Sequence, residues 1–375
     1  MGLPTGGSIA PVNVLALVSD AYGGRGGIAR YNRDLLAALA RCGRNRRTIV
    51  LPRHGKSESA GLPPRLTQLS PRGKVLYPFV ALWAAATKGP FDVVFCGHLN
   101  LVPLAAIVAR ILGVPLWLQL HGVEAWGPLT RAQTWAAERA LLVTAVSRYT
   151  RRRFAELARL DPYRVRVLPN TVDERFAPGA PPPELVDRHD LVGKEVLLTV
   201  ARLASDERRK GHDKVIRALP AIIAAHPDLV YLIVGEGDDR ARLEALANDL
   251  GVANHMRFAG QVAPEEMAGY YRLAKVFVMP SIQEGFGIVF LEAAASGLTL
   301  IGGDSDGSAD ALADGVIGIS VDPQSPDQLA FAIMTALTGA GPDPVEVQRF
   351  KLENFTRHLR DLTGMHLKST GMVAE

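Results

Sequence analysis

The hydrophobic pattern divides the chain into two halves, in each of which short apolar runs alternate with longer amphipathic stretches. Short runs rich in Val, Leu and Ile predict buried strands, and apolar residues at helical spacing predict the helices between them. This alternation is typical of a parallel sheet covered by helices. In the first half, strands are predicted at 12–19, 47–53, 91–97, 114–121, 142–147 and 165–169, and helices at 27–41, 75–88, 101–112, 131–140 and 148–157.

A cluster of Pro and Gly at 178–183 interrupts the pattern and predicts a linker, because it suits neither a helix nor a central strand. The alternation then restarts, with strands predicted at 196–201, 230–234, 256–259, 276–280, 298–302 and 318–321, and helices at 212–225, 239–249, 264–274, 288–296 and 326–337. We therefore expect two Rossmann-like, doubly wound α/β domains that face each other across a cleft. Their predicted limits are 1–177 and 191–345, with a Pro-rich linker at 178–190 and a helical tail at 346–375 that packs back on the first domain.

Length and composition agree with a two-domain globular protein of 375 residues, 48% of them hydrophobic and 21% charged. The two cysteines, Cys42 and Cys96, are too few for a disulfide framework and favour a cytoplasmic location. The N-terminal sequence lacks the basic start and apolar stretch of a signal peptide. The longest apolar run, 75–86, contains Pro78 and is shorter than the roughly 20 residues of a membrane-spanning helix.

The net charge of +4 conceals an uneven distribution along the chain. Residues 1–190 hold 25 Lys and Arg against 13 Asp and Glu, a net +12, whereas the remainder holds 17 against 25, a net −8. A basic half suits nucleic acid, an anionic membrane or a phosphorylated substrate, and a solvated basic surface explains it equally well. The lack of an aromatic platform speaks against nucleic acid.

Open parallel sheets bind ligands beyond the carboxyl ends of their strands, so the loops there are the first candidates for chemistry. After the first predicted strand, a loop containing Gly23, Gly24, Gly26 and Gly27 leads into a helix. Glycines allow backbone amides to approach a ligand, and a helix N-terminus favours an anion such as phosphate. We interpret Gly26 and Gly27 as parts of a phosphate-approach loop; the dinucleotide fingerprint is matched only formally.

The second half carries a candidate diphosphate site. Arg202 follows its first strand and Lys210 precedes the next helix, so the two cations flank one loop. Further along, Glu284 and Glu292 enclose a segment with Gly285 and Gly287 that leads into an apolar helix. Glu284 is placed to accept hydrogen bonds from sugar hydroxyls, with helix capping as the alternative. A buried carboxylate at Glu292 needs donors, which ribose hydroxyls would provide.

Taken together, these motifs resemble the retaining glycosyltransferase family 4 of the GT-B fold, over nearly the whole chain. The features that carry the resemblance are the glycine loop 23–30, His121-Gly122, Ser147-Arg148, the segment 169–173, Arg202 with Lys210-Gly211, the segment 235–237, and the Glu-x7-Glu element from Glu284 to Glu292. The spacing from Arg202 to Lys210 is longer than in many members, which leaves Arg209 as an alternative to Lys210.

The resemblance implies a role for each matched residue. Arg202 and Lys210 would hold the diphosphate, Glu292 the ribose, and Val262 would flank the base. Glu284 and the amides of the next residues would hold the donor sugar and phosphate; those residues are Gly285, Phe286, Gly287, Ile288 and Val289. His121 would lie near the donor sugar on the acceptor side.

The implied reaction moves a hexosyl group from a nucleotide-diphosphate sugar, GDP-mannose slightly favoured over a UDP-hexose, to an acceptor hydroxyl with retention. The nucleotide sugar is a substrate, and neither a cofactor nor a metal is expected. Asp304 and Asp306 spell an Asp-x-Asp pair, which we interpret as a turn. A sugar-nucleotide epimerase of the same architecture, or a nicotinamide-dependent oxidoreductase, is the alternative.

For the acceptor we expect a saccharide or a lipid-linked saccharide, bound by the basic first domain. The segment 75–86 has Leu76, Tyr77, Phe79 and Trp83 beside Lys74, a composition suited to an interfacial helix. Covering its own sheet is an equally good explanation of its periodicity. The combination predicts a peripheral enzyme on the inner face of the cytoplasmic membrane, attracted by anionic lipid.

Overall fold

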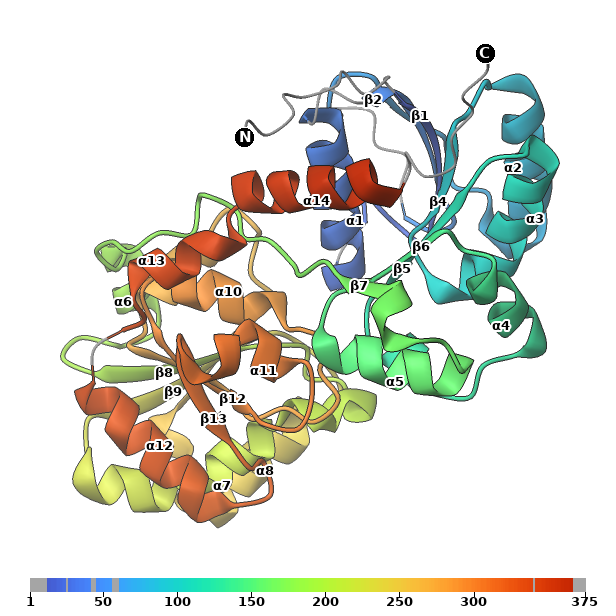
Figure 1. Ribbon diagram of the computed structural model, residues 1–375. Coiled ribbons are helices and arrows are strands. Elements are labelled where there is room, and N and C mark those ends of the chain that lie inside the picture. The colour runs from blue at the N-terminus through green and yellow to red at the C-terminus, as the bar shows by residue number, and fades with distance from the viewer. Residues whose placement is uncertain (1–11, 25, 42–44, 56–60, 340, 367–375) are drawn as a thin grey trace, which may run out of the picture. The chain divides into compact units, whose positions relative to one another are not determined.

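The computed structural model describes residues 12–24, 26–41, 45–55, 61–339 and 341–366. The chain forms two compact units (Figure 1). Unit 1 comprises the residues up to Thr171 and those from Leu352 onward, and unit 2 comprises Val172–Lys351. Arg25 of the glycine loop and Cys42 lie outside the described residues.

Unit 1 is built on a parallel sheet of seven strands in the order β3-β2-β1-β4-β5-β6-β7. The strands are β1 (Val12–Val18), β2 (Asn45–Pro52), β3 (Leu66–Gln68), β4 (Val93–Cys96), β5 (Leu116–Leu120), β6 (Leu142–Ala145) and β7 (Val165–Val167). Six of them confirm the predicted strands. The prediction of six was wrong by one, because β3 has three residues and only Leu66 is apolar, too short a pattern to register as a strand.

Helices cover both faces of this sheet. One face packs against α2 (Gly73–Thr87), α3 (Val102–Leu112), α4 (Arg131–Glu138) and α5 (Arg148–Ala158). Alternate residues of β1 show the division, because Leu15 and Leu17 belong to that core. On the other face lies α1 (Gly27–Arg41), which packs against α14 (Leu352–His366), and the rings of Tyr31 and Phe355 meet edge to face at 6.0 Å.

Unit 2 repeats the plan with six parallel strands in the order β10-β9-β8-β11-β12-β13. They are β8 (Glu195–Val200), β9 (Leu229–Val234), β10 (Met256–Gly260), β11 (Val276–Met279), β12 (Thr299–Gly303) and β13 (Gly318–Val321), and all six were predicted. One face packs against α7 (His212–Ala225), α8 (Arg240–Asp249) and α12 (Pro326–Thr338). Tyr271 of α9 (Met267–Arg272) and Phe290 of α10 (Ile288–Ala295) contact Phe277 of β11 from the other side.

The segment expected as a linker, 178–190, lies in unit 2 and contains a short helix, α6 (Pro183–Arg188), with Leu185 buried. The two stretches where the chain passes between the units run side by side at their unit 2 ends. Val172 donates its amide to the carbonyl of Phe350 at 3.0 Å and pairs in parallel with Lys351. Along the chain, α13 (Pro344–Val347) follows α12 and precedes Lys351.

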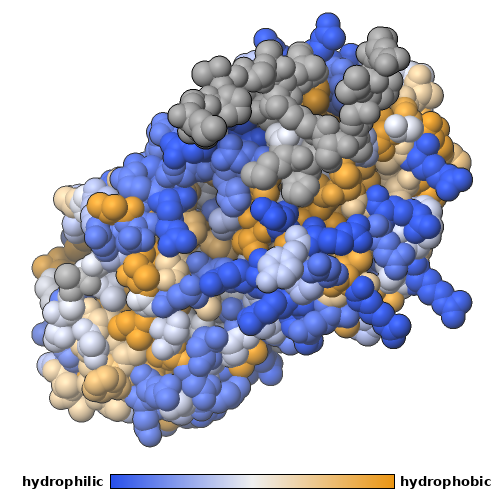
Figure 2. All heavy atoms as spheres, in the orientation of Figure 1, coloured by the Kyte–Doolittle hydropathy of each residue, from blue (hydrophilic) through white to orange (hydrophobic). Residues whose placement is uncertain are grey.

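Two neighbouring helices of unit 1 expose large apolar side chains to solvent. We call this set the α2–α3 apolar surface; it consists of Val75, Leu76, Phe79, Leu82 and Trp83 of α2 and Ile107 and Ile111 of α3. Figure 2 shows orange and tan atoms over the region of these two helices. Tyr77 is not part of it, because its ring is buried and its hydroxyl donates to the carbonyl of Leu51 at 2.9 Å. Among the described residues, no helix has the length and apolarity to cross a membrane.

Candidate active site

Strand order locates the candidate site in each sheet. In unit 2 the order reverses between β8 and β11, and in unit 1 between β1 and β4. Loops on either side of such a reversal diverge to opposite faces of the sheet and leave a crevice at the carboxyl ends of the strands. Arg202 follows β8, and Glu284 follows β11, so both predicted donor residues lie at the reversal point of unit 2.

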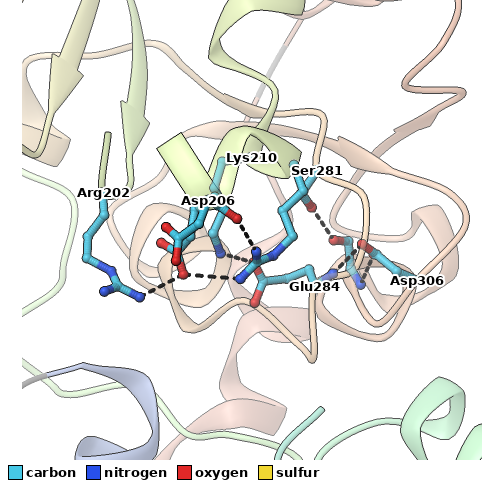
Figure 3. A network of polar contacts seen from close by, with 9 residues as sticks. Arg202, Asp206, Lys210, Ser281, Glu284 and Asp306 are labelled. Carbon is cyan, nitrogen blue, oxygen red and sulfur yellow. Dashed lines mark hydrogen bonds and ion pairs between the residues drawn. The ribbon is translucent and has the colours of Figure 1, made fainter. Parts of the chain in front are cut away.

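Two of the cations after β8, Arg209 and Lys210, lie in a short helical turn, η4 (Ser205–Lys210), and Arg202 precedes this turn. Arg202 donates to the carboxylate of Glu207 at 2.7 Å, and Arg209 donates to the same carboxylate oxygen at 3.1 Å (Figure 3). Arg209 also donates to the carbonyl of Asp206, whereas the Arg202 side chain is 75% exposed. Arg209 is therefore engaged in holding η4, and Arg202 is the cation with room to meet a ligand.

Lys210 and Glu284 form an ion pair between η4 and the loop after β11 (Figure 3). Their side chains are 19% and 15% exposed. The carbonyl of Arg209 accepts from the amide of Ile282 at 2.8 Å, so the two loops are joined by their backbones as well. The pair places a cation suited to phosphate and a carboxylate suited to sugar hydroxyls within direct contact of each other.

The same loop leads into α10, whose first turn presents backbone amides. Gly287 is the residue before the helix, with φ +87°, a value that a side chain would strain. Phe286 is buried and meets Phe350 edge to face at 6.1 Å, which anchors the loop. The amides from Gly287 to Val289 lie in the first turn, where helix geometry provides no intrahelical acceptors. This N-terminus suits an anion.

Glu292 lies within α10 and is 5% exposed. Its carboxylate accepts a hydrogen bond of 2.6 Å from the hydroxyl of Tyr271, a fully buried residue of α9. The sequence predicted that this carboxylate needs a donor and assigned ribose to that role. Tyr271 supplies a donor from within the protein, and the ribose contact stays a prediction.

The remaining predicted donor residues are spread over three loops. Val262 follows β10 at the edge of the unit 2 sheet and is half-buried. Gly26 and Gly27 belong to unit 1, as does His121, so they come from a different unit than Arg202 and Glu284. Within unit 2 the structure brings Arg202, Lys210, Glu284 and the start of α10 to one edge of the sheet.

The Asp-x-Asp segment forms a bend after β12, as predicted, but its second carboxylate is buried. Asp306 is 4% exposed and accepts from the amides of Glu284 at 2.5 Å and Ser308 at 2.8 Å. Burial raises its pKa to about 6, against the lowering effect of these two bonds. Sequence reasoning missed this contact, because a turn and a loop 22 residues away share no sequence pattern.

In unit 1 the glycine loop ends where α1 begins at Gly27, and Gly26 precedes it with φ +95°. Two side chains hold the described part of the loop. Arg33 donates to the carbonyls of Ala21 and Gly24 at 3.0 and 2.9 Å, and Gln68 of β3 exchanges two bonds with the backbone of Tyr22. The strand that the sequence pattern missed therefore helps to fix the loop that the sequence selected.

His121 follows β5 and is 9% exposed. Burial lowers its pKa to about 4, so the ring is neutral at pH 7. Its Nε2 lies 3.0 Å from the carbonyl of Gly97, which only accepts; Nε2 therefore carries the proton and Nδ1 is left as an acceptor. The amide of His121 donates to Glu124 at 2.6 Å, and its ring stands edge to face on Tyr31 at 5.1 Å. The residue is thus a fixed, neutral acceptor.

Two doubly wound α/β units, each with a polar loop cluster at its reversal point, define the GT-B class of protein. Consistent with this, residues 25–176 match the sequence model of Glycosyltransferase Family 4, and residues 184–348 match that of Glycosyl transferases group 1. The chain belongs to these glycosyltransferases, which confirms the resemblance found in its motifs.

Curated relatives share part of the chain. A GDP-mannose-dependent alpha-(1-6)-phosphatidylinositol monomannoside mannosyltransferase of Mycolicibacterium smegmatis is 36% identical over 226 residues, 57% of this chain and 58% of the relative. The protein of the same name from Mycobacterium tuberculosis is 37% identical over 251 residues, 63% of this chain and 64% of the relative. The alignments thus span less than two thirds of the relatives' length.

Solved structures agree on the fold. Anabaena Alr3699/HepE, crystallised in complex with UDP and glucose, superposes with a TM-score of 0.73 over 94% of this chain and 100% of its own, at 19% sequence identity. At that identity the likeness concerns the fold, and it confirms the predicted GT-B architecture.

Proposed function

We propose that this protein transfers a mannosyl group from GDP-mannose to a hydroxyl of a lipid-linked saccharide, with retention of anomeric configuration. The observation that carries the proposal is the Lys210–Glu284 ion pair beside Arg202 and the N-terminus of α10. This set offers two cations and several amides to a diphosphate, and one carboxylate to a sugar. Two relatives that are dependent on GDP-mannose support the choice of donor.

In the proposed reaction the bond between the sugar C1 and the diphosphate oxygen breaks, and a bond from C1 to the acceptor oxygen forms on the same face. The acceptor's proton passes to the departing phosphate oxygen, and GDP leaves. Arg202, Lys210 and the α10 amides stabilise the charge that develops on the diphosphate. These groups supply positive charge without a metal ion, and we propose that none is required.

Lys210 exchanges partners in this scheme. Without ligand it neutralises Glu284; with donor bound it meets the diphosphate, and Glu284 is released to accept from sugar hydroxyls. His121 contributes through Nδ1, the acceptor that its bond to Gly97 leaves available to a sugar hydroxyl. Because its ring is neutral, it adds no positive charge to compete with the developing charge at C1.

A direct experiment offers GDP-mannose and UDP-glucose separately, each with and without a phosphatidylinositol monomannoside acceptor, and follows product by mass spectrometry. We expect transfer from GDP-mannose only when the acceptor is present, and the same rate with EDTA. NMR of the isolated product should show the one-bond C1–H1 coupling of an α-mannoside. An epimerase converts the donor without an acceptor, and that result would replace the proposal.

We further propose that the α2–α3 apolar surface places unit 1 on an anionic membrane, at the inner face of the cytoplasmic membrane. Val75 is 79% exposed and Phe79 68%, while Arg72 and Lys74 are exposed at the start of the same helix. Apolar side chains beside basic ones suit the boundary between headgroups and acyl chains. Each basic residue near an anionic surface adds about 1 kcal/mol of attraction.

Liposome cosedimentation tests this placement with a matched pair of variants. Phe79→Ser removes part of the surface, and Phe331→Ser removes an equally exposed phenylalanine, 70% against 68%, from α12 of unit 2. We expect binding to anionic vesicles that weakens with salt, is reduced by Phe79→Ser and is unchanged by Phe331→Ser. Equal effects of the two variants, or equal binding to neutral vesicles, would refute the placement.

A further inference from the structure

We propose that Asp306 is a positioning residue that fixes Glu284 for recognition of the donor sugar. It belongs to a brace between two loops, which we define as Ser281, Glu284 and Gly285 on one side and Asp306, Gly307 and Ser308 on the other. The inference rests on the proposed function, because it assigns to Asp306 the task of holding the carboxylate that the proposed function gives to the sugar.

The brace consists of three contacts that converge on the Glu284 loop. Figure 3 shows the contact of Asp306 with Glu284 and the contact that Ser281 makes. The carboxylate of Asp306 accepts from the amide of Glu284 at 2.5 Å. The amide of Gly307 donates to the carbonyl of Glu284 at 2.9 Å, so both backbone groups of Glu284 are held by the same loop. The hydroxyls of Ser281 and Ser308 lie 3.1 Å apart and close the contact from the other end.

The carboxylate of Asp306 also accepts a hydrogen bond from its own loop. Its second carboxylate oxygen accepts from the amide of Ser308, the first residue of α11 (Ser308–Ala311), at 2.8 Å. The side chain thus uses both oxygens, one for each loop, and fixes the distance between them. A carboxylate bonded to two amides in a buried setting is a stiff connection, since both bonds are charge-assisted.

Gly307 shows how closely the loops approach. A Cβ at this position would lie 2.1 Å from the carbonyl oxygen of Gly285 and 2.7 Å from that of Glu284. Backbone atoms cannot yield as a flexible side chain does, so any residue with a side chain would push the loops apart. The loops are therefore in backbone contact, and a displacement of one moves the other.

The brace matters most when the donor is bound. Glu284 is held at three points: its amide, its carbonyl, and its carboxylate through Lys210. The proposed exchange of partners releases the carboxylate from Lys210, and the two backbone bonds then remain to position it. Asp306 therefore acts on affinity for the sugar portion, whereas Arg202 and Lys210 act on the diphosphate.

The test compares binding of GDP and of GDP-mannose, by calorimetry, in Asp306→Asn, Gly307→Ala and the control Asp304→Asn. The asparagine keeps the size of Asp306 but one of its two oxygens becomes an NH2 group, which cannot accept from an amide. Asp304 lies in the same loop and is exposed, and its carboxylate accepts from the hydroxyl of its neighbour Ser305 at 3.0 Å. GDP binding also reports whether unit 2 is folded in each variant.

We expect Asp306→Asn and Gly307→Ala to weaken GDP-mannose binding and raise the donor KM by roughly tenfold or more, the loss of one hydrogen bond to a charged group. GDP binding should stay within about twofold, and Asp304→Asn should match the wild type. Unchanged GDP-mannose affinity in Asp306→Asn, or equal losses for GDP and GDP-mannose, would overturn the inference. A wild type that binds no nucleotide sugar would instead overturn the proposed function, and the inference with it.

Discussion

Replacing Lys210 by methionine removes the charge that the proposed mechanism places on the departing diphosphate. Methionine retains most of the apolar stem, so the change concerns mainly the ammonium group. Loss of one such electrostatic donor lowers turnover about 10² to 10³-fold, or about 2.7 to 4 kcal/mol. We expect kcat for mannosyl transfer to fall by at least about a hundredfold.

The same substitution leaves Glu284 without its partner, and this creates a second effect that has to be separated. Glu284 is 15% exposed, so its carboxylate keeps little solvent contact. An unpaired acceptor in that setting costs about 1 to 3 kcal/mol of the free energy of unfolding. A double variant, Lys210→Met with Glu284→Gln, removes the uncompensated charge; we expect it to recover much of that stability and none of the turnover.

The assay measures kcat and KM for GDP-mannose alongside thermal unfolding. Arg208→Met serves as the control, because Arg208 belongs to the same turn, is 55% exposed and pairs with Asp239 instead. Asp239 retains Arg242 as a partner in that variant. Turnover in Lys210→Met within about tenfold of the wild type would refute the assignment of Lys210 to the leaving group.

Three further outcomes are expected. Glu292→Gln should weaken GDP binding by about 1.5 to 3 kcal/mol if ribose contacts this carboxylate, whereas Tyr271→Phe should leave it nearly unchanged; equal losses in calorimetry would show that the effect comes from the Tyr271 bond alone. His121→Ala should retain GDP binding and lose transfer, and transfer at the wild-type rate would remove His121 from the mechanism. The pKa of Asp306 is raised to about 6 in the folded protein from the usual aspartate value of 3.8. Its contribution to stability is therefore full below the lower value and is lost as pH rises through about 6. Asp306→Asn does not titrate, and its melting temperature relative to the wild type should therefore increase between about pH 4 and 7; a constant difference across that range would contradict the raised pKa.

The fold class was predictable because it depends on alternation that every strand and helix repeats. Eight-residue β2 and fifteen-residue α1 both appear where the apolar pattern placed them. β3 was not predicted because this three-residue edge strand buries a single leucine, and its pairing with β2 depends on tertiary contacts. The interior of α2 shows the same limit: periodicity did not reveal that Tyr77 faces the core while Phe79 faces solvent.

The residues of the candidate site were predictable individually, but their partners were not. The sequence placed Lys210 and Glu284 in one site, yet 74 positions separate them, and only the fold makes them an ion pair. For Glu292 the need for a donor followed from its apolar surroundings, whereas the donor, Tyr271, comes from another helix. Asp306 was assigned to a turn, because the hydrophobic pattern of a glycine-rich segment does not predict that one of its carboxylates is buried.

The order in which the chain is synthesised bears on how unit 1 is completed. Unit 2 is one continuous stretch, Val172–Lys351, whereas unit 1 needs α14, which is made after all of unit 2. Until then the side of α1 that packs against α14 lacks its cover, including the contact of Tyr31 with Phe355. Leu359 and Leu362 are almost fully buried in the folded protein, so α14 contributes side chains to the hydrophobic core of unit 1. Unit 2 can therefore fold as soon as its own continuous stretch has been synthesised, whereas unit 1 is completed only when α14 has followed.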